Sequence, residues 1–435
     1  MRGLPVLPVS PRLPGPQVLS ARYMTRFRCL AGDCEATCCG GGAVPVERST
    51  HRRLTLLAEP DVEAQQLLAS GIELTPDGPD FGRLRFLASG DCSMLDGAGL
   101  CRIQSKFGHD ALFDVCATYP RYVNQIDGEV QGTAPSLELF GTLSCPEVAR
   151  LALLSEDGFE LQTVDLDEAP RKLRNRFDTR EPYFQPYRMV RGALTRLLGE
   201  PDFSLDEKLF ALLWLADQLR PVLFAGCSQA PSAELKTVLG ALSGPGVLPS
   251  LAANFRSLRI DAELPLAVIW QALPPAEIRP GAQTERFDRT LRDVWAEYGR
   301  AQGAGASLSE ADLRELVAQY TTVRAAVPGP VRQRLDVLLS RYAVNHVLTT
   351  PYMLSSSLFA YAYELVVRIA MLRFLLCTRL SLFQGSAAEL DARVVEVTYA
   401  TVRGVEHAGI LSQVQKQLDA RGLNALPHAL CFLAV

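Results

Sequence analysis

The sequence predicts a mainly α-helical protein, in which a cysteine-rich module with few short strands precedes a larger all-helical region. Amphipathic segments with helix-start signals recur through the second part of the chain, whereas the alternating pattern typical of strands is sparse. Eight of the 11 cysteines lie before residue 150. We therefore expect a flexible Pro-rich arm at residues 1–20, a cysteine-rich module at 21–155 and a helical domain at 156–435.

The chain begins MRGLPVLPVSPRLPGPQVLSA. This apolar stretch has some likeness to a signal peptide, but proline interrupts it repeatedly and its only charge near the start is one arginine. Because proline is unfavourable inside a helix, the segment is a poor candidate for the helical core of a secretion signal. We expect a flexible or extended arm.

Two helices are marked by the residues at their amino-terminal ends. LDEKLFALLWLADQLRPVLF (205–224) is amphipathic, and Ser204 and Glu207 form a capping-box pattern at its start. Ser309 and Asp312 stand in the same relation in the segment 308–327, which ends before a Pro-Gly-Pro sequence. Amphipathic patterns predict further helices at 331–346, 355–380, 387–402 and 408–421.

Loops and short strands are expected elsewhere. Segments rich in proline and glycine at 241–250 and 272–283 predict loops between helices. Alternation of apolar and polar residues near 160–166 and 43–47 predicts short strands.

The most apolar segment, residues 353–377, is long enough to suggest a transmembrane helix. It contains Glu364, Arg368 and Arg373, and charged side chains are costly in hydrocarbon. We therefore expect a buried amphipathic helix and no membrane span. With neither export signal nor span, the expected location is the cytoplasm, where disulfides are rare.

Composition argues against two classes of protein. With 435 residues, 48% of them hydrophobic and 21% charged, the chain is too apolar to be disordered. A formal net charge of -4 lacks the basic excess of nucleic-acid-binding proteins, so no nucleic acid is expected as a partner.

Residues 27–41, FRCLAGDCEATCCGG, contain four cysteines, two of them adjacent. With the four that follow before residue 150, the cluster comprises Cys29, Cys34, Cys38, Cys39, Cys92, Cys101, Cys116 and Cys145. The remaining Cys227, Cys377 and Cys431 lie in apolar sequence and are expected to be core residues.

Four explanations compete for this cluster. Disulfides are disfavoured by the expected compartment, and the adjacent Cys38 and Cys39 could close only a strained ring. A nucleophilic cysteine needs a positioned base, and His109 is the one histidine inside the later part of the cluster. Chance burial of eight thiols in one segment is a weaker explanation than metal binding. The residues favour a soft metal bound by thiolates, which makes the module a metal-cluster module.

The spacing of the cysteines bears on the identity of the metal. The intervening lengths are irregular, and no Cys-x-x-Cys pair occurs. Structural zinc sites usually contain such pairs, whereas iron–sulfur ligands can come from distant loops. An iron–sulfur cluster, of the 4Fe-4S type, is therefore favoured, with zinc as the alternative. Eight thiols exceed the four that one such cluster needs, so the spacing leaves open one metal site or two.

Motifs of other cofactor enzymes are missing from the sequence. The Cys-x3-Cys-x2-Cys motif of radical enzymes is absent, because Cys39 directly follows Cys38. No glycine-rich loop follows a strand, so a Rossmann-type methyltransferase or dehydrogenase is disfavoured. We interpret Gly40, Gly41 and Gly42 as a turn that lets the backbone approach the metal cluster.

Three stretches carry all eight cysteines in order: FRCLAGDCEATCC, DCSMLDGAGLCRIQSKFGHDALFDVCATYPR (91–121) and LSCPEVARLAL (143–153). Together they resemble the flagellin lysine-N-methylase family, which belongs with a broader group of iron- or zinc-chelating cysteine-cluster proteins. A weaker similarity runs through RYAVNHVLTTPYM (341–353). Family members usually follow the adjacent cysteines with Gly-Trp, whereas this chain has three glycines and no tryptophan there.

The resemblance implies a cytoplasmic protein-lysine N-methyltransferase that uses S-adenosylmethionine and contains an iron–sulfur cluster. Its partner would be flagellin or another protein with surface lysines, and all eight cysteines would be candidate metal ligands. The alternative is a non-catalytic iron- or zinc-binding protein with a redox or metal-handling role. In that case the cluster would stabilise the module without taking part in a reaction.

Methyl transfer to lysine suggests which other residues act. The amine needs a free lone pair, yet an unperturbed lysine has a pKa of about 10.4, so an acidic or phenolic group must accept or relay a proton. The candidates beside the thiols are Asp33, Glu35, Asp91, Asp96 and Tyr119. We favour Glu35 and Tyr119 as catalytic residues because they lie within the matching motifs. Arg121, which could hold a carboxylate, is assigned to cofactor binding together with Gly40 and Gly41.

Overall fold

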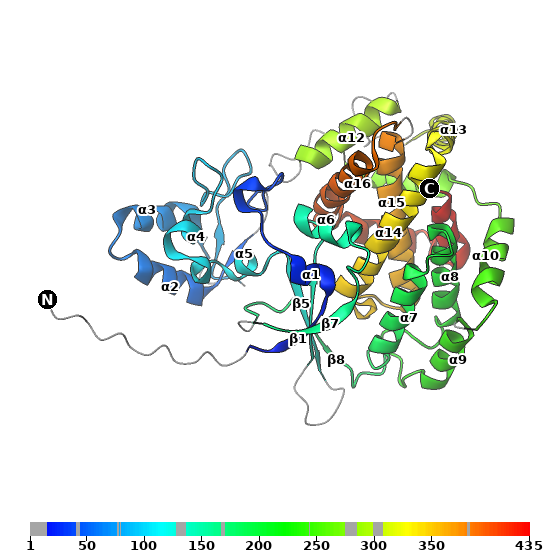
Figure 1. The fold of residues 1–435 in the computed structure, drawn as a ribbon, viewed down its shortest axis with the longest axis horizontal. Helices are drawn as coiled ribbons and strands as arrows, with labels where there is room; N and C mark the ends of the chain where they lie inside the picture. Colours follow the sequence, from blue (N-terminus) through cyan, green and yellow to red (C-terminus); the bar gives the residue numbers. More distant parts are fainter. Residues whose placement is uncertain are drawn as a thin grey trace.

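A computed structural model describes residues 15–40, 44–75, 78, 80–127, 136–166, 170–242, 244–274, 285–298, 308–380 and 383–435. The described residues form a small lobe and a large body, each with its own hydrophobic core (Figure 1). The buried residues of the small-lobe core lie between Val46 and Ala117. The core of the large body draws on segments before and after them, from Val18 to Ala36 and from Val123 to Val435.

The small lobe consists of short helices packed beside a three-stranded antiparallel sheet with strand order β2-β4-β3. The strands are β2 (Pro45–Val46), β3 (Ile72–Leu74) and β4 (Gly82–Leu84). The helices are α2 (Arg48–Ala58), α3 (Val62–Gly71), α4 (Arg102–Phe107), the 3-10 turn η2 (His109–Ala111) and α5 (Asp114–Thr118).

A mixed five-stranded sheet with strand order β7-β1-β6-β5-β8 forms one side of the large body. Its strands are β1 (Gln17–Ala21), β5 (Arg121–Asp127), β6 (Ser136–Gly141), β7 (Leu161–Asp165) and β8 (Asn175–Asp178). Strand β1 runs parallel to β6, and β5 runs parallel to β8, whereas the other pairs are antiparallel. The chain enters the small lobe after β1 and returns to the sheet at β5, so the lobe is an insertion between two strands (Figure 1).

Helices make up the rest of the large body, with α14 and α15 at its centre (Figure 1). The first of them along the chain are α1 (Arg22–Arg26), η1 (Ala31–Asp33), α6 (Pro146–Leu154), α7 (Tyr187–Gly199) and α8 (Leu205–Gln218). The chain continues with α9 (Ser232–Leu242), α10 (Val247–Ser257), α11 (Glu263–Ala272), α12 (Glu285–Glu297), α13 (Glu310–Ala326), α14 (Gly329–Thr349) and η3 (Tyr352–Leu354). It ends with α15 (Leu358–Leu380), α16 (Ala387–Thr401), the π-helical turn η4 (Val402–Glu406), α17 (Ile410–Ala420), α18 (Leu426–Cys431) and η5 (Phe432–Ala434).

The prediction of a mainly helical protein is confirmed, and the capping signals locate two helix starts correctly. Ser204 caps α8, and the Glu207 carboxylate accepts the Ser204 N–H at 2.8 Å. Ser309 and Asp312 form the same box at the start of α13. Helices α14 to α17 correspond to the four further helices that the amphipathic pattern predicts, and β7 and β2 to the two strands.

Three expectations need correction. The carboxyl-terminal region is not all-helical, because β7 and β8 follow α6 and belong to the sheet. Part of the expected arm forms β1, whose alternate residues are buried, while residues 1–14 lie outside the described residues. Most of the expected loop 241–250 lies in the ends of α9 and α10, whereas residues 275–283 of the other loop are not described.

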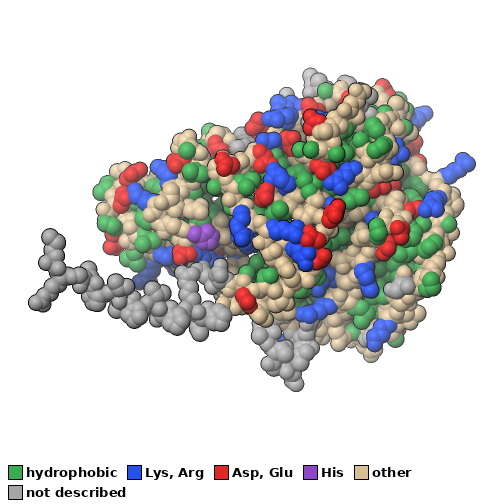
Figure 2. All heavy atoms as spheres, in the orientation of Figure 1, with side chains coloured by type: hydrophobic (Ala, Val, Ile, Leu, Met, Phe, Trp, Pro, Cys, Tyr) green, Lys and Arg blue, Asp and Glu red, His purple; other side chains and the backbone are tan. Residues whose placement is uncertain are grey.

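Helix α15 is buried inside the protein along most of its length. This agrees with the expectation of a buried helix, which was based on the charged residues that make a membrane span unfavourable. In the part of the chain that the structure describes, no single helix has the length and apolar composition of a membrane span, although the bent pair Ala233–Leu242 and Val247–Ser257 passes that test as a unit. On the face of the large body that Figure 2 shows, acidic and basic side chains are intermixed.

The buried His346 on α14 predicts a pH dependence of stability. Its ring stacks on Tyr361, and burial, reinforced by the charges of Arg368 and Arg174, lowers the pKa of His346 well below its usual value. The unfolded chain therefore binds a proton below about pH 6.5 that the folded chain does not bind. Stability should fall as the pH drops through this range, by up to about 1.4 kcal/mol per pH unit from this group.

Urea unfolding from about pH 7.5 to about pH 5.5 measures this effect. The slope of the free energy of unfolding against pH should be smaller in His346→Gln than in the unaltered protein. It should be unchanged in His109→Gln, since His109 is exposed. An unaltered slope in His346→Gln would show that His346 is not the cause of the loss of stability at low pH.

Candidate functional site at the lobe junction

The eight clustered cysteines lie on turns and at the ends of short helices. Cys34 ends η1, Cys101 and Cys145 immediately precede α4 and α6, and Cys116 lies within α5. The structure describes all 11 cysteines of the chain, and each has a free thiol. Cys92 is buried in the core of the small lobe and Cys145 in the core of the large body, so the cluster extends across the boundary between them.

Arg403 on η4 holds two cysteine-bearing loops together. Its Nε donates to the carbonyl oxygen of Ser144 at 2.6 Å. Its Nη1 and Nη2 donate to the carbonyl oxygens of Thr37 and Ala36 at 3.1 and 3.3 Å. A cysteine directly follows Ser144 in one loop, and another directly follows Thr37 in the other. A single buried guanidinium thus fixes the spacing between two thiol-bearing segments.

Sequence reasoning missed Arg403, although its context contains a signal. It is the one charged residue in the run YATVRGV, and only 6% of it is exposed. A buried arginine in apolar sequence needs hydrogen-bond partners, so such a residue is a candidate for a structural or functional role. Its partners lie up to 367 residues away, and no local pattern identifies them.

Helix α12 closes the junction from another side. Its Phe287 packs so closely on Gly404 that a Cβ at Gly404 would lie 2.1 Å from the Phe287 ring. The neighbouring Arg286 donates to the carbonyl oxygen of Glu35 at 2.8 Å and pairs with Glu396 at 2.9 Å. Glycine at position 404 therefore permits the approach that brings Arg286 to the cysteine loop.

Tyr119 lies at the same junction. Its hydroxyl is 3.1 Å from the Ser144 hydroxyl, which is itself 3.0 Å from the hydroxyl of Thr142. Burial raises the pKa of Tyr119 well above its usual value, and the charge of Arg403 partly opposes this rise. Tyr119 is therefore a neutral phenol at pH 7 that can orient or relay a proton through a hydroxyl chain.

Glu35, the other expected catalytic residue, already has interaction partners for its carboxylate and its backbone carbonyl. Arg150 forms ion pairs with both Glu35 and Glu147. With its carbonyl bound to Arg286, Glu35 connects α6, α12 and the cysteine loop. Its role as a proton acceptor stays a prediction.

Arg121, which is expected to bind a cofactor, is the first residue of β5. Its guanidinium lies 5.2 Å from the centre of the Phe27 ring. Burial lowers the pKa of Arg121, and the thiols of Cys29 and Cys145 act in the opposite direction. Arg121 therefore faces thiols from both ends of the cluster.

The glycines are less informative. Gly40 pairs with Asp91 in an isolated antiparallel bridge that links the first cysteine loop to the second. Gly41 lies outside the described residues. The expected contact of either residue with a cofactor stays a prediction.

The adjacent cysteines differ in acidity. A hydrogen bond with Cys39, aided by the charge of Arg403, lowers the pKa of Cys38 to about 7. The same hydrogen bond and burial raise the pKa of Cys39. Because the thiolate is the metal-binding form, Cys38 is prepared to bind a metal near neutral pH.

The donor set fits a soft metal in chemistry and number. Eight free thiols lie between residues 29 and 145, and thiolates are the ligands that zinc and iron–sulfur clusters prefer. Within the described ranges, however, no three His, Cys, Asp or Glu side chains already stand in positions that could hold a metal ion. Metal binding by these cysteines stays a prediction.

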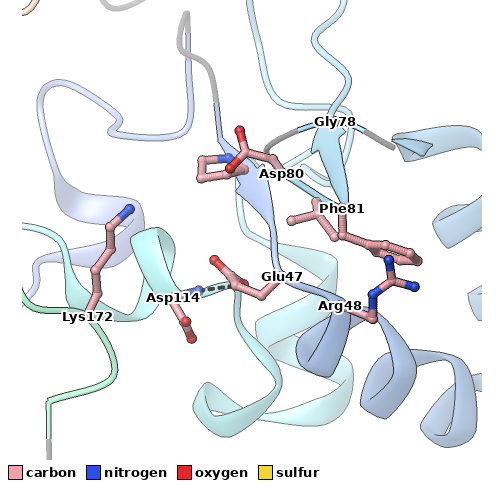
Figure 3. A pocket seen from close by; sticks show the side chains of 9 residues that line it. Glu47, Arg48, Gly78, Asp80, Phe81, Asp114 and Lys172 are labelled. Atoms are coloured by element: carbon pink, nitrogen blue, oxygen red, sulfur yellow. Dashed lines mark hydrogen bonds between the residues drawn. The ribbon is translucent and has the colours of Figure 1, made fainter. Parts of the chain in front are cut away.

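A pocket of about 440 Å³ opens in the small lobe, on the side of α5 (Figure 3). Glu47, Arg48 and Phe81 lie on its wall with Asp114, and Lys172 reaches it from the linker to β8. The Glu47 carboxylate accepts the Asp114 N–H at 3.2 Å. The pocket is thus lined by charges of both signs, and sequence reasoning did not identify it.

Comparison with known proteins finds a protein family whose model matches part of the chain. Residues 191–432 match the model of the FliB lysine N-methylase C-terminal domain. The chain is 23% identical over 256 residues to a lysine-N-methylase of Salmonella typhimurium and, to the same extent, to one of Salmonella choleraesuis. Each alignment covers 58% of this chain and 60% of the relative, so the chain spans less than two thirds of the length of these proteins.

A third relative is a flagellar biosynthetic protein FliU of Salmonella muenchen. It is 27% identical over 146 residues, which cover 33% of this chain and 81% of the relative. No solved structure matches the chain.

Proposed function

The chain belongs to the family of proteins with a FliB lysine N-methylase C-terminal domain, and we propose that it is a protein-lysine N-methyltransferase. The proposed methyl donor is S-adenosylmethionine, and the proposed metal cofactor is an iron–sulfur cluster. The proposed substrate is a protein with accessible lysines, with flagellin as the first candidate. The names of the relatives support the reaction and the flagellar substrate.

One observation carries the proposal beyond the family match. Arg403 lies inside the matched region, 191–432, and its guanidinium binds the two cysteine loops, which lie outside that region. The family domain and the cysteine cluster therefore build one junction. Tyr119 and Arg121 stand at the same place.

The junction offers chemistry suited to methylating an amine. Lysine must lose its proton before its nitrogen can attack, and transfer from water into a buried slot lowers the pKa of lysine. The neutral Tyr119 hydroxyl, connected to Ser144 and Thr142, can accept an N–H hydrogen bond and direct the lone pair. Arg121 can bind a carboxylate, which the methionine end of S-adenosylmethionine carries.

The cysteines would hold the cluster, whose contribution when bound is an iron site that anchors the methionine end of the donor. The positive charges of Arg403, on η4, and of Arg121, in β5, would favour the ionised form of the thiol ligands. The remaining steps depend on how the protein orients the amine and excludes water.

Incubation of anaerobically purified protein with flagellin and S-adenosylmethionine labelled in the methyl group tests the proposal. We expect label in flagellin, and peptide mass spectrometry should assign one added methylene per modified lysine. Flagellin whose surface lysines are replaced by arginine should take up no label. Absence of transfer by protein with its metal intact would leave a non-catalytic metal-binding role in its place.

Replacement of Tyr119 by phenylalanine tests the proposed catalytic hydroxyl. We expect kcat to fall about 100-fold, since general acid–base groups commonly contribute at least that factor, while the bound metal stays constant. Tyr122→Phe is the matched control, because Tyr122 lies in the adjacent strand β5 with Arg174 over its ring. Equal kcat values in the two variants would remove Tyr119 from the reaction.

A further inference from the structure

The buried phenol of Tyr399 lies on the face of α16 that meets α12 and the first cysteine loop (residues 34–39). Glu396 precedes it by three residues and Arg403 follows it by four, so the three side chains are neighbours at the end of the helix. The guanidinium of Arg403 lies 5.6 Å from the centre of the Tyr399 ring. Glu396 pairs with Arg286 of α12, the helix beside α16 (Figure 1). Tyr399 therefore lies beside the two arginines that bind carbonyl groups of this loop.

The hydroxyl of Tyr399 has no hydrogen-bond partner among the described residues, although only 2% of the residue is exposed. A buried hydroxyl without a partner is unfavourable, and native proteins contain few of them. Tyr119 differs in this respect, because its hydroxyl is 3.1 Å from that of Ser144, whose carbonyl binds Arg403. Of these two phenols, Tyr399 is therefore the one whose hydroxyl is free to bind a substrate group.

The charges around Tyr399 favour a neutral amine over a protonated one. The neighbouring carboxylates of Glu396 and Glu35 are each paired with an arginine. The hydrogen-bond partners of Arg403, in contrast, are carbonyl oxygens, which leave its positive charge without a compensating carboxylate among the described contacts. A nearby positive charge lowers the pKa of an amine, because it disfavours the charged form. A lysine side chain beside Tyr399 would therefore lose its proton more easily than one in water.

A partly exposed polar layer separates Tyr399 from water. It consists of Arg286, Glu396 and Glu35, and between 29% and 32% of each side chain is exposed. Arg286 connects the layer by donating to the carbonyl oxygen of Glu35 at 2.8 Å and by pairing with Glu396. Ion pairs near the surface contribute little to stability, so an incoming side chain can displace these contacts at low cost. The layer therefore gives a lysine of a protein substrate a route to the phenol.

We propose that the Tyr399 hydroxyl binds the amine of the substrate lysine and accepts one of its N–H groups during methyl transfer. The role rests on the proposed methyltransferase function. Since a neutral primary amine has two N–H groups, the other is left for Tyr119.

The hydrogen bond orients the nitrogen lone pair for attack on the methyl carbon of the sulfonium donor. As the new C–N bond forms, the C–S bond breaks and its electron pair passes to sulfur. The methylated nitrogen takes up the positive charge that sulfur loses, and it then releases a proton to water. Tyr399 keeps its own proton throughout, since burial raises the pKa of its hydroxyl well above the usual value.

Replacement of Tyr399 by phenylalanine in the full-length protein tests the proposal. We expect kcat for flagellin methylation to fall about 100-fold, the loss common for a group that assists proton transfer or orientation at the reacting atom. The KM for flagellin should change less than about threefold, because the amine is a small part of a protein–protein contact. The urea denaturation midpoint should not fall, since the hydroxyl has no partner to lose among the described residues.

Tyr361→Phe is the matched control. Tyr361 is equally buried, its hydroxyl also lacks a partner among the described residues, and its ring stacks on His346. This variant should keep the kcat of the unaltered protein. Equal kcat values in the two variants, or a lower denaturation midpoint in Tyr399→Phe, would overturn the role of Tyr399 alone. Absence of transfer by the unaltered protein would refute the proposed function as well.

Discussion

Replacing Glu138 with alanine should lower the free energy of unfolding by about 3 to 5 kcal/mol, the loss typical of breaking a buried ion pair. Glu138 lies in β6, and none of its surface is exposed. Its carboxylate pairs with Arg191 and accepts the hydroxyl of Tyr187 at 2.8 Å. Removal of the carboxylate leaves the buried guanidinium without its counter-charge, at a point where α7 packs on the sheet.

Urea denaturation of the alanine variant measures the loss. Glu138→Gln should fall between the alanine variant and the unaltered protein, because the amide still accepts a hydrogen bond but carries no charge. The matched control is Glu310→Ala, which removes a pair with Arg314 in which both side chains are largely exposed. A loss no larger than that of the control would show that the buried pair contributes little to the stability of the sheet.

The sheet around Glu138 illustrates what the sequence could not reveal. Helix starts are local signals, since Ser204 and Glu207 are three residues apart and define a cap without reference to the rest of the chain. The pairing of β1 with β6 joins Ser20 to Leu139, across 119 residues. The Pro-rich sequence before Gln17 suggested an arm, and nothing local marks the five residues that enter the sheet.

The cysteines show the same limit. Their number, compartment and irregular spacing predict one region of thiols, because those properties can be read from composition and order. The burial of Cys92 in one core and of Cys145 in the other depends on the insertion of the small lobe between β1 and β5, which is a property of the fold. The adjacent Cys38 and Cys39 look like a unit in the sequence, and a hydrogen bond joins their thiols in the structure.

Replacing Arg403 with alanine should have the largest effect on the proposed reaction. The change leaves the carbonyl oxygens of Ala36, Thr37 and Ser144 without their donor. Each lost hydrogen bond to a charged group is worth about 1.5 to 3 kcal/mol. We expect the free energy of unfolding to fall by about 3 to 5 kcal/mol in total, which is less than the full sum, because the loops can relax so that water replaces part of the lost bonds. Methyl transfer should fall more than about 100-fold, as small misplacements of reacting groups are costly.

Metal content distinguishes this positioning role from a general loss of structure. The alanine variant should bind less metal than the unaltered protein, since Arg403 holds the loops that contain Cys38 and Cys145. Arg403→Lys should keep part of this metal, because lysine retains the charge but not the forked donor geometry that reaches three carbonyls. Arg421→Ala is the control, because Arg421 is exposed. Loss of metal in Arg403→Lys without a change in its urea denaturation midpoint would identify Arg403 as the residue through which the family domain positions the cysteine loops, whereas full metal content in Arg403→Ala would contradict that role.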